Sequence, residues 1–411
     1  MTARKITRID SKIILNPAQC PDPWFYTHCA LNPYRGCAFS CKYCDGKANW
    51  YGLPDFGTHI RVKNDVVSQL RKQLMKLGFE SSRTGKQTSL GQFLNITVER
   101  PEQRRKIVLG VGGGVTDVYQ PIEKTERITR KIIKLLIEFE VPAFFLTKST
   151  LIERDLDLIG ELHDRTYACV NFSVTLADES LKRLFEPYSP PTHKRFDVLG
   201  KFREAGVRGG ISMMPLLPFI GDTDENLTAL LKMAQEVKAD HTLISGLTLK
   251  AGNREEFLPI IAKHFPDYLE FYKKIFPPNN TYGHPHPIPG MRNVMMAGHV
   301  LSKQFGIYPR IHKPIIEGYK PNNLKVVEHL HYVLYLKQWL LRKMSIREQN
   351  NWYKNCCQVE LMDEDVSSLS QEERREKIGG MPAFHTIVDE FLERGDSKVR
   401  EVLEEEISHQ T

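Results

Sequence analysis

The chain of 411 residues can form one large domain or two smaller ones, and its 41% hydrophobic and 26% charged residues are ordinary for a soluble globular protein. Its eight cysteines are too sparse for a disulfide-stapled secreted scaffold, and no stretch reaches the roughly 20 apolar residues that span a bilayer. The first residues, MTARKITRIDSK, are polar and basic without an apolar run behind them, so we expect a cytoplasmic protein with no secretory signal and no membrane contact.

The net charge of +7 is unevenly distributed along the chain. Residues 361–411 contain 14 acidic and 6 basic side chains, a net charge of −8, which leaves +15 for residues 1–360. Basic residues are concentrated in residues 61–106, which contain 11 basic and 4 acidic side chains. Such a surface suits a polyanionic partner such as nucleic acid, although a solvated basic surface explains the same composition.

Strand and helix patterns alternate after a short N-terminal segment, residues 1–27. The predicted strands are 28–34, 106–114, 143–149, 168–175, 210–217 and 241–249. The predicted helices between them are 62–77, 122–140, 152–163, 178–186, 192–205 and 223–238. Such a succession indicates parallel strands with right-handed crossovers, and hence the α/β class. A doubly wound sheet and a full or partial (β/α) barrel both fit, and either places ligands at the carboxyl ends of the strands.

Two parts of the chain depart from this alternation. Residues 79–105 are polar and rich in bases, and we interpret them as a basic loop inserted into a unit that spans 28–276. A turn-rich segment, PPNNTYGHPHPIPG, opens a helical C-terminal part over 277–360, with helices expected at 291–306 and 324–344. Residues 361–411 are predicted to form an acidic helical tail.

Three cysteines, Cys37, Cys41 and Cys44, follow the first predicted strand with the spacing C-x3-C-x2-C. Thiolates are soft, anionic ligands for iron–sulfur clusters, zinc or copper. Three cysteines on a four-iron cluster leave one iron open to a small molecule. The alternative is a zinc site with Cys29 as the fourth ligand, although zinc sites usually consist of two close cysteine pairs.

The C-x3-C-x2-C spacing with an aromatic residue, Tyr43, before the last cysteine resembles the signature of radical S-adenosylmethionine (SAM) enzymes. The segments NPYRGC at 32–37, TDVYQPIE at 116–123, LTKS at 146–149 and FEPYSP at 185–190 further resemble the branch of that superfamily related to spore photoproduct lyase, a DNA repair enzyme.

The resemblance implies a partial (β/α)6 TIM-like barrel, here with a helical C-terminal extension. It also implies a [4Fe-4S] cluster that cleaves SAM reductively, and a 5′-deoxyadenosyl radical that abstracts hydrogen from a substrate. The electron would come from a reducing partner such as a flavodoxin or ferredoxin.

Roles for individual residues follow from the same resemblance. Cys37, Cys41 and Cys44 would bind the cluster, and Tyr43 would lie beside the adenine or the cluster. The residues expected to contact SAM are Gly112, Gly113, Gly114, Thr116, Lys148 and Ser173. Glycine permits close backbone approach, Lys148 would meet the SAM carboxylate, and Ser173 would meet the ribose. A flexible turn, a surface lysine and a core serine are the alternatives for these residues.

Further polar residues are expected at or near the mouth of the barrel. Asp117 and Tyr119 are candidate catalytic residues there, and Arg35, Gln120 and Glu123 lie in the same two motifs. These residues could either bind the substrate or support neighbouring side chains, and the sequence does not distinguish the two roles. A helix start is enough to explain Glu123.

Two positions differ from the lyase in ways that affect the last half of its reaction. Gly114 stands where the lyase has its hydrogen-donating cysteine, and Asp45 stands where it has a tyrosine after the last cluster cysteine. We therefore expect a relative with a different substrate or a different fate for the product radical.

The remaining cysteines give no clear signal. Cys20 and Cys29 precede the cluster motif, and either could approach the mouth of the barrel. Cys169 is expected in the core, and the adjacent Cys356 and Cys357 are expected to be buried or incidental thiols, with a second cluster or a redox pair as the alternative.

Three hypotheses for the function remain open. The first is a radical SAM enzyme that acts on nucleic acid or nucleotides. The second keeps the chemistry but takes a peptide or small metabolite. The third is a zinc-stabilised nucleic-acid-binding protein without catalysis.

Overall fold

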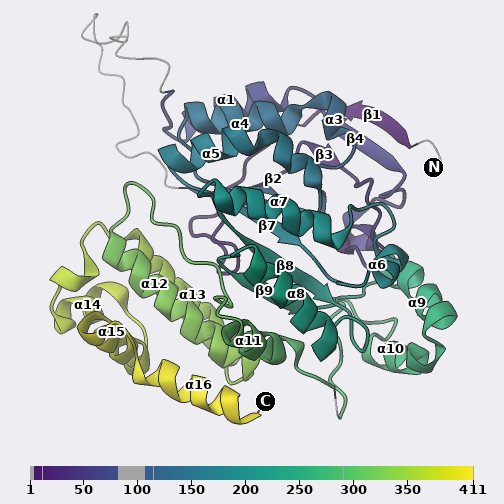
Figure 1. The fold of residues 1–411 in the computed structure, drawn as a ribbon. Coiled ribbons are helices and arrows are strands. Elements are labelled where there is room, and N and C mark those ends of the chain that lie inside the picture. The colour runs from purple at the N-terminus through teal and green to yellow at the C-terminus, as the bar shows by residue number, and fades with distance from the viewer. Residues whose placement is uncertain (1–3, 12, 82–106, 114, 290, 411) are drawn as a thin grey trace, which may run out of the picture.

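The structure is a computed structural model, and it describes residues 4–11, 13–81, 107–113, 115–289 and 291–410. The predicted insertion, from residue 82 to 105, and Gly114 therefore lie outside the described residues. Figure 1 shows an α/β unit followed by a group of helices formed by the last third of the chain.

A six-stranded parallel sheet forms the centre of the α/β unit. Its strands, in spatial order, are β2 (Cys29–Leu31), β5 (Leu109–Gly112), β6 (Ala143–Thr147), β7 (Ala168–Ser173), β8 (Arg208–Leu216) and β9 (Thr242–Gly246). Adjacent strands in this order are paired in parallel, and the spatial order is the same as the order of the six predicted strands along the chain. The α/β class and the six parallel strands are thus confirmed. Within the described residues β2 and β9 are not paired with each other, so the barrel is open rather than closed.

Helices on the outer face of the sheet connect successive strands (Figure 1). They are α1 (Val66–Lys76), α3 (Glu123–Glu126), α4 (Ile128–Glu138), α5 (Leu156–Arg165), α6 (Glu179–Phe185), α7 (Thr192–Glu204) and α8 (Asp224–Glu236). The predicted helix 122–140 is divided in two by Arg127, whose φ of 51° is left-handed. Side chains alternate along each strand, so Phe145 and Val170 face these helices in the main core.

The inner face of the sheet carries a separate, smaller core. Phe144, Cys169 and Leu243 point inward and pack against Tyr26 and Ile311. Two segments outside the sheet therefore fill the interior of the open barrel. One consists of the residues before β2. The other follows Tyr308, which forms a β-bridge to His241. They close the floor beneath the carboxyl ends of the strands.

A second, three-stranded sheet was not predicted. It contains β1 (Lys5–Ile9), β4 (His59–Lys63) and the two-residue β3 (Tyr34–Arg35), in the order β1-β4-β3. β3 immediately precedes the cysteine segment. Beyond β9, helices α9 (Asn253–His264) and α10 (Leu269–Ile275) pack against the cysteine segment, with Phe257 stacked on Phe185.

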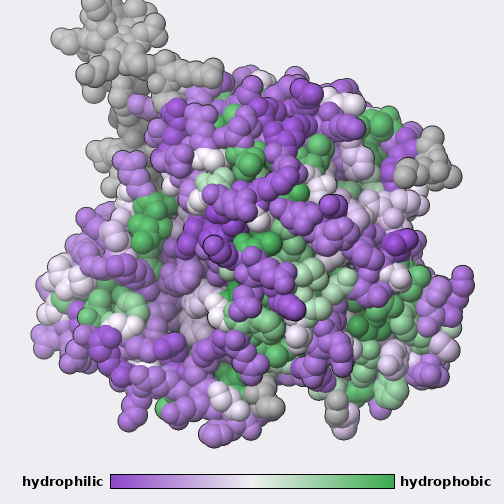
Figure 2. Space-filling model, in the orientation of Figure 1, coloured by the Kyte–Doolittle hydropathy of each residue, from purple (hydrophilic) through white to green (hydrophobic). Residues whose placement is uncertain are grey.

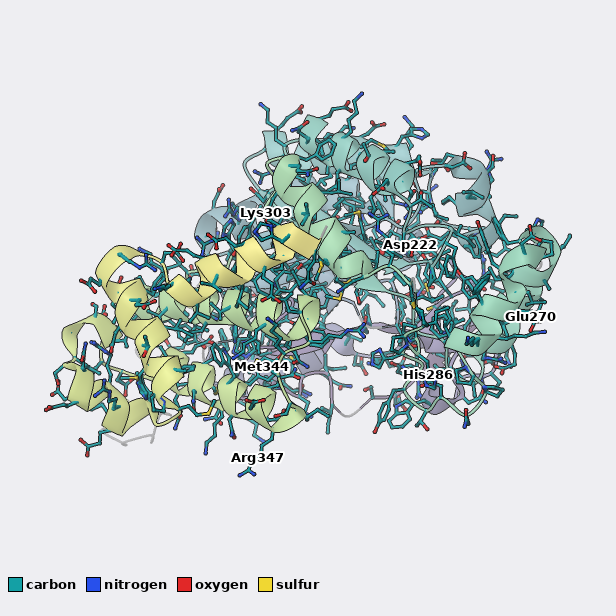
Figure 3. All side chains as sticks on the ribbon, turned by 90° about the horizontal axis from the view of Figure 1, so that it is seen from below. Asp222, Glu270, His286, Lys303, Met344 and Arg347 are labelled. Carbon is teal, nitrogen blue, oxygen red and sulfur yellow. A yellow bond between two sulfur atoms is a disulfide. The ribbon has the colours of Figure 1, made fainter. Side chains whose placement is uncertain are left out.

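The C-terminal helices form their own core. They are α11 (Val294–Gln304), α12 (Pro321–Leu334), α13 (Ile346–Leu361), α14 (Gln371–Ile378), α15 (Pro382–Arg394) and α16 (Lys398–Gln410). The predicted helix 324–344 ends early because α12 passes into a π-helical turn over Tyr335–Leu340. The acidic tail is helical, as predicted, and its Ile387 and Ile407 are buried in this core. Figure 3 shows Lys303 of α11 beside α16, where its ammonium lies 2.8 Å from Glu404.

A disulfide joins the N-terminal segment to the C-terminal helices. Cys20 is bonded to Cys357 of α13, with 5.8 Å between the two Cα atoms. The expectation of an incidental thiol is therefore wrong for Cys357, and Cys20 is bonded to α13 and does not line the cavity. The neighbouring Cys356 is a buried free thiol.

The face of the molecule seen in Figure 2 is mostly hydrophilic, with small hydrophobic patches between the hydrophilic side chains. Among the described helices, none combines the length and the hydropathy that a bilayer-spanning segment requires.

Candidate active site

A cavity of about 410 Å³ opens at the carboxyl ends of the strands. Nine of the predicted site residues line it: Cys37, Cys41, Tyr43, Cys44, Gly113, Thr116, Asp117, Lys148 and Ser173. Phe25, Leu146 and Met214 of the inner core form part of its wall. Gly112 and Tyr119 are not among its lining residues, and Gly114 lies outside the described residues.

The three cysteines of the predicted motif lie on the loop that connects β3 to β4, and this loop packs against α9. Cys37 and Cys41 are buried, and backbone N–H groups of Phe39 and Asp117 donate to the Cys37 sulfur. Burial raises the pKa of Cys37 to about 12 and raises the pKa of Cys41 and Cys44. The thiols are therefore neutral without a metal, and iron would displace their protons on binding.

The donor set fits a [4Fe-4S] cluster. Three thiols line one cavity, which supplies ligands to three irons and leaves the fourth iron for another molecule. Cys29, the fourth ligand of the zinc alternative, lies in β2 and does not line the cavity. Among the side chains that the structure describes, no group of three His, Cys, Asp or Glu is arranged to hold a single metal ion.

Two glycines shape the edge of the cavity at the end of β5. Gly112 has a φ of 83°, and a Cβ atom there would lie 2.7 Å from the carbonyl oxygen of Leu146 on the neighbouring strand. Gly113 has a φ of 87° and lines the cavity, where a Cβ would have only a methyl group of Leu146 within 4 Å. The first glycine is required by strand packing, and the second leaves the cavity wall bare for close approach of a ligand.

Lys148 reaches into the cavity from the end of β6. Its ammonium donates to Ser173 Oγ at 2.6 Å and lies 3.1 Å from a carboxylate oxygen of Glu186. It is also 5.6 Å from the centre of the Tyr43 ring. An ammonium has three N–H donors, so these contacts leave one for the carboxylate of a ligand. The structure thus brings Lys148, Ser173 and Tyr43 together, as the sequence predicts.

Glu186 connects these residues and was not identified from the sequence. It is buried, accepts a hydrogen bond from the Tyr43 hydroxyl, and pairs with the fully buried Arg195. Burial alone would raise the pKa of Glu186, but the charges of Arg195 and Lys148 and the Tyr43 hydrogen bond hold it well below its usual range. The motif FEPYSP, which contains Glu186, was the available signal.

Asp117 lies at the cavity wall, where its carboxylate is occupied by the protein. It accepts hydrogen bonds from the backbone N–H of Lys148 at 2.8 Å, from Thr147 Oγ1 at 2.7 Å and from the N–H of Tyr119 at 2.9 Å. Asp117 therefore fixes the end of β6 and the backbone of Lys148. Its pKa is raised by burial, which these hydrogen bonds oppose.

Three further residues of the two motifs, Tyr119, Gln120 and Glu123, are buried behind the cysteine loop rather than at the mouth, whereas Arg35 is exposed. Tyr119 is fully buried, and its hydroxyl donates to Asp155 at 3.2 Å. Gln120 is fully buried against the backbone beside Cys37, and the Glu123 carboxylate accepts a hydrogen bond from Tyr34. Substrate contact by Tyr119, Gln120 or Glu123 would require these buried side chains to move.

Asp45, the residue after the last cysteine, ties the cysteine loop to the segment beyond β9. It lines the cavity and accepts from the Lys250 ammonium at 2.6 Å and from Thr248 Oγ1 at 3.3 Å. The carboxylate therefore contributes an ion pair to the rim of the cavity.

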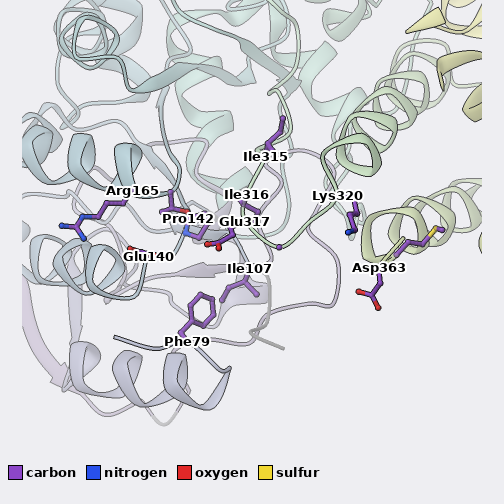
Figure 4. Close-up of a pocket in the computed structure, with 13 residues that line it drawn as sticks. Phe79, Ile107, Glu140, Pro142, Arg165, Ile315, Ile316, Glu317, Lys320 and Asp363 are labelled. Carbon is purple, nitrogen blue, oxygen red and sulfur yellow. The ribbon is translucent and has the colours of Figure 1, made fainter. Parts of the chain in front are cut away.

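Another hollow lies at the opposite end of the sheet (Figure 4). Ile107, Pro142 and Thr166, which line it, immediately precede strands β5, β6 and β7. Ligands of parallel α/β folds bind at the carboxyl ends of the strands, so this hollow is not the candidate active site.

Comparisons with known proteins give the following matches. Residues 31–234 match the family model described as the radical SAM superfamily. A protein of Mycobacterium tuberculosis strain H37Rv, named only as uncharacterised, is 29% identical over 260 residues, which are 62% of this chain and 68% of that one. A likewise uncharacterised protein of Methanocaldococcus jannaschii is 27% identical over 222 residues, 54% of this chain and 71% of the other.

Two solved structures are similar at lower levels. A mutant of spore photoproduct lyase with bound AdoMet and dinucleoside spore photoproduct has 14% identity and a TM-score of 0.49, over 74% of this chain and 82% of that one. Coproporphyrinogen III oxidase from Escherichia coli also has 14% identity, with a TM-score of 0.34 over 74% of this chain and 53% of that one.

Proposed function

This chain belongs to the radical SAM superfamily, whose members use a [4Fe-4S] cluster and SAM, and from that premise we propose the residues and the substrate of its reaction. The observation that carries the proposal is one cavity lined by three cysteines, a bare glycine edge and a lysine ammonium. When bound, the cluster and SAM supply a 5′-deoxyadenosyl radical that abstracts hydrogen from the substrate.

The chain's own residues bind and orient these groups. Cys37, Cys41 and Cys44 hold three irons, and Lys148 pairs with the SAM carboxylate in a charge-assisted contact. Gly113 and Thr116 face the cofactor along the edge of β5, and Ser173 holds Lys148 in place. The inner core supplies apolar side chains to the floor of the cavity.

Metal analysis and product analysis test the cluster assignment. Protein reconstituted without oxygen is expected to contain about four irons and four sulfides per chain and, when reduced with SAM, to release 5′-deoxyadenosine. Cys41→Ala should lose both properties. Cys169→Ala, which removes an equally buried thiol of β7, should keep them. Zinc in place of iron and sulfide would disprove the proposal.

We further propose that the substrate is a nucleic acid. The +15 charge of residues 1–360 supports this, as does an exposed rim beside the cavity. Trp50 is 79% exposed there, and Arg35 donates to the backbone of the adjacent Tyr51, whose hydroxyl pairs with the cavity residue Asp45. Exposed aromatic rings and cations at an active-site mouth suit stacking and phosphate contacts.

Oligonucleotide binding tests the substrate class. Fluorescence anisotropy with single-stranded DNA and RNA should show affinity that falls steeply as salt rises from about 50 to 200 mM. Trp50→Ala should weaken binding by roughly 10-fold or more, as loss of a stacked base does. Arg347→Gln, on the distant helix α13, should not. Absence of binding at the lowest salt would favour a peptide or small metabolite instead.

The same proposal includes the cellular location of the enzyme and its electron donor. We expect a cytoplasmic protein that receives electrons from a reductant of the flavodoxin or ferredoxin type.

A further inference from the structure

The two segments NPYRGC (32–37) and TDVYQPIE (116–123), which are 79 residues apart in the sequence, lie against each other. Gln120 makes the central contacts. Its Oε1 accepts the backbone N–H of Ala38 at 2.8 Å, and its Nε2 donates to the carbonyl oxygen of Gly36 at 3.0 Å. The carboxamide therefore holds the backbone on both sides of Cys37.

A carboxamide can make both contacts at once. The carbonyl before Cys37 needs a donor and the N–H after it needs an acceptor, and a glutamine side chain carries both. Gln120 is fully buried, so an apolar side chain in its place would leave two buried backbone groups without partners. The loop has little freedom to adjust, because a Cβ on Gly36 would lie 2.5 Å from the His59 carbonyl oxygen.

A second contact anchors the residues before Gly36. The Tyr34 hydroxyl donates to Glu123, whose carboxylate also accepts from the backbone N–H of Ile128 at 3.0 Å and from Arg154 at 2.9 Å. Glu123 is fully buried. The start of NPYRGC is thereby fixed to the beginning of α4.

The same turn also contacts the cysteine sulfur. The backbone N–H of Asp117 donates to Cys37 Sγ, and the Asp117 carboxylate is bound to the end of β6. The position of this N–H is therefore set by the sheet, whereas the position of the sulfur is set by the loop that Gln120 holds. Hydrogen bonds to cluster sulfurs are one of the factors that set the reduction potential of an iron–sulfur cluster.

We propose that Gln120 is a positioning residue of the cluster: by holding Gly36 and Ala38, it keeps Cys37 Sγ at the Asp117 N–H and so sets the reduction potential. The proposal rests on the proposed function, because it requires that Cys37 bind the cluster. Loss of the carboxamide releases the loop, weakens the N–H···S contact and lowers the potential.

The test compares Gln120→Met with a matched control, Asn323→Leu. Methionine keeps the size of glutamine and removes both hydrogen bonds. Asn323 is also fully buried and also clamps a loop: it donates to the carbonyl of Glu364 at 2.9 Å and accepts from the N–H of Val366 at 2.7 Å. That loop belongs to the C-terminal helices, so the control loses a comparable clamp away from the cysteines.

Two measurements are made on each variant. In the metal-free protein, amide hydrogen exchange of a peptide covering residues 36–41 should be at least about fivefold faster in Gln120→Met than in wild type, and unchanged in Asn323→Leu. In the reconstituted protein, Gln120→Met should bind iron but show a more negative midpoint potential and a changed EPR spectrum. Asn323→Leu should match wild type in both.

The outcomes separate the two proposals. A wild-type protein that assembles no cluster contradicts the proposed function itself. A wild-type cluster whose potential and EPR spectrum are unaltered in Gln120→Met contradicts the role of Gln120 alone. If Gln120→Met does not fold, Tyr34→Phe replaces it: this variant loses one hydroxyl contact and should shift the potential in the same direction by less, and an unshifted potential contradicts the role.

Discussion

At the scale of single residues, the candidate site depends on how buried charges are balanced. Lys148 carries its charge into a cavity whose floor is apolar, and Glu186 compensates that charge at 3.1 Å. Glu186 in turn remains ionised because Arg195 pairs with it. A ligand carboxylate that enters the cavity therefore meets an ammonium that is already oriented, which reduces the cost of binding.

Lys148→Met should weaken SAM binding without removing the cluster. A hydrogen bond to a charged group contributes about 1.5–3 kcal/mol, so the dissociation constant should rise by roughly 10-fold or more. Anaerobic equilibrium dialysis measures the affinity, and iron analysis verifies the cluster. Lys201→Met, which removes an exposed lysine paired with Glu153, is the control and should bind SAM normally. An unchanged affinity in Lys148→Met would rule out its contact with the carboxylate.

Arg195→Met should destabilise the fold strongly. Removal of one partner of a buried ion pair leaves an uncompensated charge and costs about 3–5 kcal/mol. Because the pKa of Glu186 is lowered in the folded state, the stability that its charge interactions contribute is present above the ordinary pKa of glutamate and is lost as the pH falls below it. Urea unfolding should therefore show a larger loss at pH 7 than at pH 3.5. Equal losses at both pH values would contradict this account.

At the scale of elements, the sequence predicts much of the barrel and little of what surrounds the cysteines. The predicted strand 143–149 begins with the apolar run AFFL, and the observed β6 and β9 lie inside the predicted strands 143–149 and 241–249. The small sheet was missed because β3 has two residues, too few for a periodic pattern. Glu186 was missed as a site residue, and the contacts of Gln120 could not be predicted, because the partners of both residues are distant in the sequence and become neighbours only by folding.

The link between the N-terminal segment and α13 is also an element-scale feature with a testable consequence. The disulfide Cys20–Cys357 fixes the segment that carries Phe25 into the cavity wall. Disulfides typically stabilise by roughly 2–4 kcal/mol through restriction of the unfolded chain. Addition of a reductant should therefore lower the melting temperature of the wild-type protein.

The double variant Cys20→Ser/Cys357→Ser is the control for this effect. It should melt at the temperature of the reduced wild type and should not respond to reductant. Thiol labelling followed by mass spectrometry should find both cysteines blocked before reduction and reactive after it. Labelling of both without reductant would show that the bond does not form.

At the scale of the whole molecule, the inner core of the barrel packs against the core of the C-terminal helices. Arg310 lies at that interface between the rings of Trp24 and Tyr335, at 4.4 and 5.1 Å from their centres, and Lys313 pairs with Glu360 at 2.9 Å with both side chains buried. The segment before β2, the floor of the barrel and the C-terminal helices are therefore packed as one body. Unfolding of the C-terminal core should therefore disturb the packing of the side chains at the floor of the cavity.

Acid should weaken the C-terminal core at a mild pH. His329 stacks on Phe391 at 4.5 Å and contacts Ser397 Oγ at 2.8 Å. Burial, assisted by the charges of Arg400 and Arg394, lowers the pKa of His329 to about 4, against about 6.5 in the unfolded chain. The unfolded state therefore takes up a proton first, and stability falls as the pH drops from about 6.5 towards 4. For this one group the loss between pH 7 and 4.5 is on the order of 2 kcal/mol.

His329→Gln removes that titration and should flatten the pH dependence. The measured quantity is the difference in unfolding free energy between pH 7 and 4.5, which should shrink by an amount on the order of 2 kcal/mol in the variant. Any constant cost of the substitution cancels in this difference. His284→Gln, which removes an exposed histidine, should retain the full wild-type slope. An identical slope in wild type and His329→Gln would mean that this histidine does not limit the stability of the molecule in acid.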